Sequence, residues 1–515
     1  MPAFFALGAA LRIGLYVANH GLYADEARLA LSILHRTPRE LLTPLEFGQV
    51  APAGFLLLVK GAEQIFGSSE PALRLVPLLM GLASLALFFS VARRCLKPGG
   101  ALLACFLFAI SEPLVLYAVE VKQYSGDVTA ALALCWLAIG IGKGPVRTVQ
   151  WAGLGLAGGA AILFSFPAVF VLGGIGLAFL LAAGPARRTQ TLLGLSVAVG
   201  LSAAGLAATL LLSPLPAGQN ARLQQYFTEF LPGFAPGGIL AGARWLLGRI
   251  PRLFEFPGGL DRGLSVLCAV VGAVALARRE ARLLAIWAGA AAFALAAACL
   301  RLYPFEGRLV LFLVPAVYLL VGEGVDQIRG LLRFAPAGGA FVSGALLILL
   351  LMHPVAGSFD GMKHPRHFEQ VLPVLRHVRA ARRPGDSVFV YYAAQYATRY
   401  YLETRRVTLV DLPLPELLAP TSQAIGVGWH LPALVSRPPT FFVGTESRQN
   451  WLDYGRQLQA LSGLPRVWII FSHVNVFLGI DERRLFLEYL DAAGTRLETF
   501  ERPGAIAYLY DLSHH

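Results

Sequence analysis

Apolar runs that are long enough to cross a bilayer recur through the first two-thirds of the chain, and short polar segments separate them. A helix that spans the hydrocarbon core needs about 20 predominantly apolar residues. The pattern therefore predicts a polytopic α-helical membrane protein with roughly eleven transmembrane helices. Their approximate ranges are 3–19, 72–92, 100–117, 127–143, 149–164, 168–184, 191–213, 263–277, 283–300, 309–322 and 337–352.

Two of these runs depend on how their ends are interpreted. The first, from Phe4 to Ala18, is short, contains Arg12 and lacks a small-residue cleavage site. We interpret it as a transmembrane helix rather than a signal peptide. The stretch from 149 to 184 is interrupted by the Pro-containing residues 164–167, which predicts two helices joined by a tight hairpin.

The pattern changes after residue 353. Short runs typical of buried strands alternate there with helical stretches, which predicts an α/β domain with a mainly parallel sheet. The strand-like runs are Val388–Tyr392, Val407–Val410, Thr440–Val443 and Val467–Phe471. We therefore expect a transmembrane domain over 1–352 and a soluble domain over 353–515. No GxGxxG sequence opens a helix in the second domain, which disfavours nucleotide binding.

Loop charge predicts how the chain is oriented in the membrane. With a cytoplasmic N-terminus, five loops that face the cytoplasm are all basic, as the positive-inside rule requires. They are 93–97, 143–147, 187–188, 278–282 and 329–333. The long loops 20–71 and 214–262 and the C-terminal domain then lie outside. Arginine is far commoner than lysine, which favours a GC-rich bacterial source. The expected location is the bacterial inner membrane, with the C-terminal domain in the periplasm.

Composition agrees with this organisation and excludes other classes of protein. Of the 515 residues, 56% are hydrophobic and 14% are charged, against about 25% charged residues in soluble proteins. The formal net charge is +12, but the basic residues cluster in short loops between apolar runs, so no nucleic-acid partner is expected. The five cysteines lie in or beside apolar runs, and their spacing matches no metal site.

The first candidate for chemistry is the acidic pair Asp25 and Glu26, just beyond the first transmembrane helix. Adjacent carboxylates at a membrane surface can act as a general base or bind a hard divalent cation. The alternative is a solvated helix start, because acidic side chains favour the positive end of a helix dipole. A metal ion therefore stays an open alternative, and no other cofactor is expected.

A second polar cluster lies between the third and fourth predicted transmembrane helices. Lys122 stands there among tyrosines, and an ammonium group in such a place can hold a phosphate. The alternative is interfacial anchoring, for which Tyr and Lys are also enriched. The cluster consists of Glu112, Tyr117, Glu120, Lys122, Gln123, Tyr124 and Asp127.

A third cluster, Arg301, Tyr303, Glu306 and Arg308, lies in a short outward loop. Two arginines in such a loop run against the positive-inside rule, and binding an anionic lipid head group would explain them. The alternative is pairing with Glu306 or another nearby acid. Arg74, just inside the second transmembrane helix, also calls for a partner, because charge is costly there.

These pieces together resemble the GT-C glycosyltransferases, in the branch of the protein O-mannosyltransferases and the lipid A aminoarabinose transferase. The resemblance covers roughly residues 1–330 and is strongest over 20–130. The matching segments are Asp25-Glu26, Pro52 to Leu58, Phe66 to Arg74, Glu120 to Ser125 and Tyr303 to Arg308. One departure is Gln49-Val50-Ala51-Pro52, where relatives often have a histidine before the proline, which weakens the argument for a bound metal.

The resemblance implies a polyprenyl-phosphate sugar donor and transfer on the non-cytoplasmic face. It makes Asp25 the candidate base, with Glu26 orienting it or the acceptor, and it assigns Lys122 and Arg308 to the carrier phosphate. We extend the predicted phosphate site to Tyr124, Arg301 and Arg74. Further site candidates are Glu120, Tyr117, Tyr303 and Glu306.

The leading hypothesis is therefore an inverting glycosyltransferase that moves a sugar from the lipid carrier to a hydroxyl acceptor. The competing hypothesis is a transporter or flippase of a glycolipid, without covalent chemistry. Transporters tend to show internal repeats and ionisable residues near the midplane. No obvious repeat is found, and apart from Arg12 the predicted transmembrane helices are nearly free of charge. The expected partners are the lipid-linked donor, membrane lipids and a glycan, lipid or protein acceptor.

Overall fold

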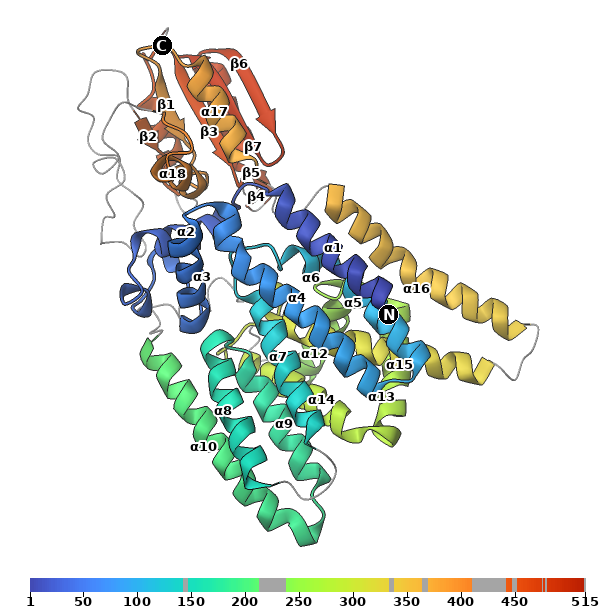
Figure 1. Ribbon diagram of the computed structural model, residues 1–515. Helices are drawn as coiled ribbons and strands as arrows, with labels where there is room; N and C mark the ends of the chain where they lie inside the picture. Colours follow the sequence, from blue (N-terminus) through green and yellow to red (C-terminus); the bar gives the residue numbers. More distant parts are fainter. Residues whose placement is uncertain are drawn as a thin grey trace.

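The computed structural model describes residues 1–141, 147–212, 238–332, 338–363, 369–409, 441–446, 452–474, 476–477 and 479–513. Within these ranges a long bundle of helices carries a small sheet at one end (Figure 1). Several predicted features lie outside the described residues. They are 143–146 and 333 in two basic loops, 214–237 in the second long loop, and Val410 and Thr440 in two predicted strands.

The predicted transmembrane segments coincide with helices of the bundle, except that 100–117 is divided between two helices and 309–322 begins in a 3₁₀ turn. The helices are α1 (Pro2–Ala18), α4 (Glu70–Cys95), α5 (Pro98–Ile110), α6 (Glu112–Leu116), α7 (Tyr124–Gly140), α8 (Thr148–Phe164), α9 (Ala168–Ala182), α10 (Arg188–Leu212), α13 (Arg262–Arg279), α14 (Ala281–Cys299), α15 (Val314–Leu332) and α16 (Gly338–Lys363). In the described part, five helices are long and apolar enough to cross a membrane, and α1, α5, α7, α8 and α9 are shorter apolar helices. The chain is a multi-pass membrane protein.

The two details about helix ends are resolved. Helix α8 ends at Phe164 and α9 begins at Ala168, so the predicted hairpin is confirmed. In α1, Arg12 is fully buried and donates to the carbonyl oxygens of Gly8 and Ala109 at 2.9 and 3.2 Å. Ala109 is in the last turn of α5, whose carbonyls lack helical partners. The guanidinium of Arg12 therefore pairs with backbone dipoles inside the bundle.

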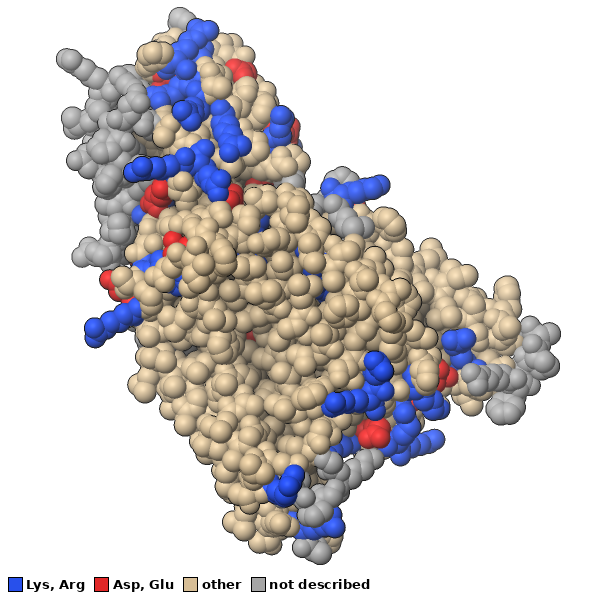
Figure 2. Space-filling view, in the orientation of Figure 1, with Lys and Arg blue, Asp and Glu red and all other residues tan. Residues whose placement is uncertain are grey.

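Charged side chains gather at the two ends of the visible face, and a broad band between them is nearly free of charge (Figure 2). Two basic loops meet at one end, where Arg279 donates to the carbonyl of Cys95 at 3.1 Å and Arg282 to that of Ile141 at 2.7 Å. The sheet lies at the other end (Figure 1). The arrangement has the polarity that the loop charges predict, and the assignment of the two ends to cytoplasm and periplasm stays a prediction.

The first long loop folds into helices that lie between the bundle and the sheet (Figure 1). Its elements are α2 (Ala24–His35), the 3₁₀ turns η1 (Glu40–Leu42) and η2 (Glu46–Gly48), and α3 (Ala53–Phe66). From the second long loop the described part includes α12 (Gly238–Glu255), and the third ends in the 3₁₀ helix η5 (Gly307–Leu313). Loop helices thus cover the end of the bundle that carries the sheet.

The five-stranded sheet has the order β2-β1-β3-β7-β6. Its strands are β1 (Ser387–Val390), β2 (Phe441–Val443), β3 (Val467–Ser472), β6 (Thr495–Arg502) and β7 (Ala505–Asp511). Helices α17 (Val371–Ala381), α18 (Gln395–Glu403), α20 (Leu452–Gln459) and α21 (Glu482–Ala493) and the short strands β4 (Val476–Phe477) and β5 (Ile480–Asp481) accompany it. Strand β1 is parallel to β2 and β3, but β7 is antiparallel to β3 and β6. The sheet is therefore mixed rather than mainly parallel.

Two strand predictions need correction. The hairpin of β6 and β7 was not predicted, because β6 is largely exposed and charged and lacks the apolar run of a buried strand. Residues 407–409, which were predicted as a strand, pair with no described strand. The soluble and membrane parts also share one apolar core, in which Leu31 and Ile33 of α2 lie with Val388 and Trp468 of the sheet. This core holds the first loop against the sheet.

Candidate functional site

The carboxylate of Asp25 is the centre of a polar group built from three distant segments. Asp25 lies in the first turn of α2. Its Oδ2 is 3.1 Å from Nζ of Lys122 and accepts a hydrogen bond of 2.7 Å from Nη2 of Arg308, at the start of η5. Its Oδ1 accepts a hydrogen bond of 3.2 Å from Nε2 of Gln49. The first loop, the α6–α7 connection and the loop before α15 therefore converge on one carboxylate.

Gln49 also accepts a hydrogen bond of 2.6 Å from Nζ of Lys122, so its amide group bridges Asp25 and Lys122. A strained turn positions it, because Phe47, two residues earlier, has φ of +56°. Lys122 and Gln49 are buried, whereas the Arg308 side chain is 31% exposed. A ligand therefore reaches Asp25 most easily from the Arg308 side.

The electrostatics of Asp25 and Lys122 follow from this geometry. Burial by itself would raise the pKa of Asp25, but the charges of Lys122 and Arg308 and the contact with Lys122 outweigh it, so the pKa lies well below its usual range. Burial lowers the pKa of Lys122, and the negative charge of Asp25 opposes that change. Asp25 is therefore a carboxylate at neutral pH.

Glu26, the neighbour of Asp25, forms a separate buried pair with Arg74 of α4. The guanidinium donates to both carboxylate oxygens, at 3.1 and 2.8 Å, and the two side chains are only 5% and 3% exposed. Arg74 also donates to the carbonyls of His20 at 2.5 Å and Gly21 at 3.3 Å, while the N–H of Val121 donates to Glu26 at 2.8 Å. This pair ties the start of α2 to α4 and to the segment that carries Lys122.

The structure places the other candidates at different distances from this group. Cζ of Arg308 lies 5.3 Å from the centre of the Tyr124 ring. Tyr117 packs edge-on against Tyr124, with ring centres 5.2 Å apart. Glu120 is buried two residues before Lys122. Lys122, Arg308, Tyr124, Tyr117 and Glu120 thus lie close together, and their assignment to a site stays a prediction.

Three further candidates have other contacts. Tyr303 donates to the carbonyl of Leu309 at 2.8 Å, which shapes the loop before η5. Glu306 pairs with Arg249 of α12 at 2.5 Å. Arg301 is exposed at φ of +58°, and no hydrogen bond or ion pair joins its side chain to another described residue. Their assignment to the site stays a prediction.

The structure adds residues to which the sequence analysis gave no role. Gln49 touches Asp25, and Arg28 follows Asp25 by three residues on α2, so both helix positions share a face. The spacing of Arg28 was visible in the sequence, whereas the contact of Gln49 depends on the turn at Phe47.

The C-terminal segment also contacts the residues around Asp25. Tyr23, directly before α2, packs edge-on against His473 after β3, with ring centres 5.1 Å apart. His473 pairs with Glu369 at 2.7 Å, and the hydroxyl of Tyr401 accepts a hydrogen bond of 2.9 Å from the N–H of Leu22. The sheet domain therefore supports the segment that begins α2.

No metal-binding group of three or more His, Cys, Asp or Glu side chains occurs among the described residues. The Asp25 carboxylate is instead surrounded by cationic groups, and Glu26 has Arg74 as its partner. A divalent cation at Asp25 would have to displace both Lys122 and Arg308. The residues around Asp25 therefore suit an anionic ligand better than a metal ion.

Comparison with known proteins identifies the fold. Residues 50–212 match the family described as "Dolichyl-phosphate-mannose-protein mannosyltransferase". ArnT from Cupriavidus metallidurans, in a crystal structure with undecaprenyl phosphate, is similar with a TM-score of 0.50 and 13% identity over 98% of this chain and 97% of that one. The archaeal oligosaccharyltransferase AglB from Archaeoglobus fulgidus, in complex with an inhibitory peptide and a dolichol-phosphate, is similar with a TM-score of 0.50. Its sequence is 10% identical, and the similarity covers 98% of this chain and 74% of that one. No sequence among the curated proteins matches.

The resemblance to the GT-C glycosyltransferases is thereby confirmed at the level of the fold. Similarity extends over nearly the whole chain, sheet domain included, and the family match spans Arg74, Lys122 and Tyr124. The chain has a GT-C fold of the kind seen in ArnT and matched by the protein O-mannosyltransferase family.

Proposed function

We propose, starting from this GT-C fold, that the chain is an inverting glycosyltransferase that moves a sugar from a polyprenyl-phosphate carrier to a hydroxyl acceptor on the extracytoplasmic face. The observation that carries the proposal is the contact of Asp25 with Lys122 and Arg308. It combines a carboxylate that can take a proton with two cations that can hold a phosphate. The structural neighbours bind undecaprenyl phosphate and dolichol-phosphate, which supports a carrier of this class.

In the proposed reaction the acceptor oxygen attacks the anomeric carbon of the sugar from the face opposite the carrier. The new carbon–oxygen bond forms as the bond from that carbon to the phosphate oxygen breaks, which inverts the configuration. The acceptor proton passes to Asp25, and the bonding electrons leave on the carrier phosphate. Lys122 and Arg308 would stabilise the charge that develops on this phosphate.

Substitution of Asp25 provides the direct test. Purified protein is incubated with a panel of polyprenyl-phosphate sugars and cell-envelope extract as the source of acceptor, and release of free polyprenyl phosphate is measured. Because general-base catalysis contributes about 10²–10⁴-fold, Asp25→Asn should lower turnover by at least 10²-fold. The matched control is Asp453→Asn, which removes a partly exposed acid of α20 that pairs with Arg456, and it should behave as wild type.

Two results would contradict the proposal in different ways. Turnover by Asp25→Asn within a few-fold of wild type would exclude Asp25 as the base. Failure of the wild-type protein to release lipid phosphate from any donor, together with movement of the intact glycolipid between the leaflets of a vesicle, would favour the transporter. Unchanged thermal unfolding of Asp25→Asn would show that a lost activity reflects chemistry rather than misfolding.

A further inference from the structure

Among the residues that the structure describes, Arg28 differs from the other cations near Asp25 in having no acidic partner. Arg74 pairs with Glu26, and Lys122 and Arg308 contact Asp25. The guanidinium of Arg28 makes no hydrogen bond or ion pair with any residue in the described ranges, and its Nε is shielded from solvent without a partner. A shielded N–H that lacks a partner destabilises the folded protein, so such a group calls for a ligand.

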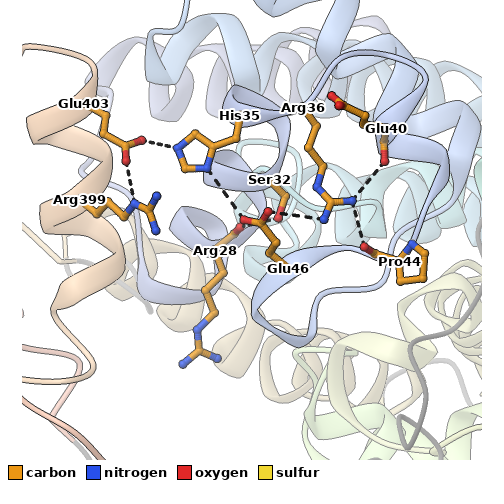
Figure 3. Close-up of polar contacts among 9 residues, drawn as sticks. All are labelled: Arg28, Ser32, His35, Arg36, Glu40, Pro44, Glu46, Arg399 and Glu403. Carbon is orange, nitrogen blue, oxygen red and sulfur yellow. Dashed lines mark hydrogen bonds and ion pairs between the residues drawn. The ribbon is translucent and has the colours of Figure 1, made fainter. Parts of the chain in front are cut away.

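The acids of the neighbouring network, Glu46 and Glu403, already have partners. His35 pairs with Glu403 of α18 and with Glu46, Arg36 also contacts Glu46, and Arg399 bonds Glu403. In Figure 3 the guanidinium of Arg28 points away from this network. The guanidinium of Arg28 therefore does not form an ion pair with Glu46 or Glu403.

The sheet domain supplies a platform that holds this guanidinium in place. Cζ of Arg28 lies 4.4 Å from the ring centre of Tyr396 on α18. The Tyr396 ring packs edge-on against Phe47 at 5.3 Å, and Phe47 belongs to the strained turn that also positions Gln49. Stacking of a guanidinium on an aromatic ring fixes its plane and leaves its edge free to donate two parallel hydrogen bonds.

The position of Arg28 connects this group to the reacting carboxylate. Arg28 and Asp25 are three residues apart on α2, so they are neighbours on one helix face. The charge of Arg28 also contributes to the low pKa of Asp25. An oxyanion held by Arg28 would thus lie beside Asp25 but apart from the contacts of Lys122 and Arg308.

We infer that Arg28, stacked on Tyr396, forms an anion-binding site that joins the first loop to the sheet domain and holds a phosphate oxyanion of a substrate. The inference rests on the proposed function and extends it. It gives the C-terminal domain a part in substrate recognition, because Tyr396 orients the guanidinium. The phosphate belongs either to the lipid carrier or to a water-soluble group on the acceptor side, and guanidinium chemistry is the same for both.

The test measures binding to the full-length protein in detergent with two probes. The first is undecaprenyl phosphate, for which the dissociation constant is determined. The second is inorganic phosphate, for which the rise in thermal unfolding temperature is recorded. The variants are Arg28→Gln, Arg28→Lys, Tyr396→Leu and Tyr396→Phe. Arg39→Gln, which removes an exposed arginine from the same loop, is the matched control.

The expected result is at least tenfold weaker binding of one probe by Arg28→Gln. Arg28→Lys should lose several-fold, because a lysine cannot present two parallel donors. Tyr396→Leu should weaken binding several-fold, whereas Tyr396→Phe keeps the ring and, like Arg39→Gln, should stay within twofold of wild type. Arg28 leaves no acid of the described residues unpaired and loses only its contact with the Tyr396 ring, so without ligand Arg28→Gln should unfold within a few degrees of the wild-type temperature.

The two probes separate the sources of the anion. Weaker binding of undecaprenyl phosphate assigns the anion to the carrier, and loss of the phosphate response with unchanged lipid binding assigns it to the acceptor side. Wild-type behaviour of Arg28→Gln with both probes would overturn the inference. The proposed function fails by a different result, namely absence of lipid-phosphate release by the wild-type protein.

Discussion

The buried pair of Glu26 and Arg74 permits a quantitative prediction, because sequence and structure give Arg74 different roles. The sequence predicted a phosphate ligand, whereas the structure gives this guanidinium two bonds to Glu26 and two to backbone carbonyls. Arg74→Met leaves the Glu26 carboxylate, 3% exposed, without a cation. Removal of one partner of a buried pair costs about 3–5 kcal/mol, so we expect a loss of about 4 kcal/mol in the free energy of unfolding.

The assay is equilibrium unfolding in mixed micelles with increasing SDS, applied to a double-mutant cycle. Glu26→Gln keeps an oxygen that accepts the Val121 N–H but loses the charge, and we expect it to cost about 2 kcal/mol. The double variant Glu26→Gln/Arg74→Met removes both charges. Its loss in the free energy of unfolding should be about 2 kcal/mol smaller than the sum of the two single losses.

Additive losses, or a loss below about 1 kcal/mol in Arg74→Met, would refute this reasoning. The sequence-based assignment would then regain support if the same variant bound undecaprenyl phosphate at least tenfold more weakly. A stabilising role predicts the opposite combination, with large destabilisation and little change in lipid affinity for the molecules that remain folded.

Two further predictions concern the sheet interface and the helix bundle. Hydrogen bonds to Glu403 and Glu46 raise the pKa of His35 to about 9, so its stabilising charge is fully present below pH 6.5 and is lost as the pH rises through 9. After solvent screening we expect this charge to contribute about 1 kcal/mol to the free energy of unfolding. The unfolding temperature should therefore fall more steeply with rising pH in wild type than in His35→Gln. A Cβ at Gly324 would lie 1.8 Å from the Cys268 carbonyl oxygen, so Gly324→Ala should lower the free energy of unfolding by about 3 kcal/mol in the same SDS titration. The control is Gly330→Ala on the same helix, whose Cβ would meet nothing within 4 Å and which should leave the free energy of unfolding unchanged. Equal effects of the two substitutions would contradict the close packing of α13 and α15.

The fold could be predicted from the sequence wherever one local pattern decides the outcome. Apolar runs predicted the helices of the bundle, and the break at residues 164–167 was visible because Ser165 and Pro167 interrupt the apolar run there. The hairpin of β6 and β7 was missed, since β6 carries charged residues on an exposed edge and its pairing partner rather than its composition makes it a strand.

The candidate site was predictable in its members but not in their pairing. Asp25, Lys122 and Arg308 were chosen by residue type and loop position, yet no local pattern shows that one carboxylate meets both cations across 97 and 283 positions of the chain. Arg74 and Arg308 look alike in sequence, and only the fold distinguishes the one with a buried glutamate from the one that is 31% exposed. Gln49 was missed because its contact depends on the left-handed turn at Phe47.

The two cations on Asp25 impose an order on the proposed reaction. While Lys122 and Arg308 both contact the carboxylate, its pKa lies far below that of any hydroxyl acceptor, and a carboxylate stabilised in this way is a poor base. A phosphate that enters from the exposed Arg308 side competes for the same two cations and returns basicity to Asp25 as it binds. The donor would therefore activate the base that removes the acceptor proton, so an acceptor that binds first meets an inactive site.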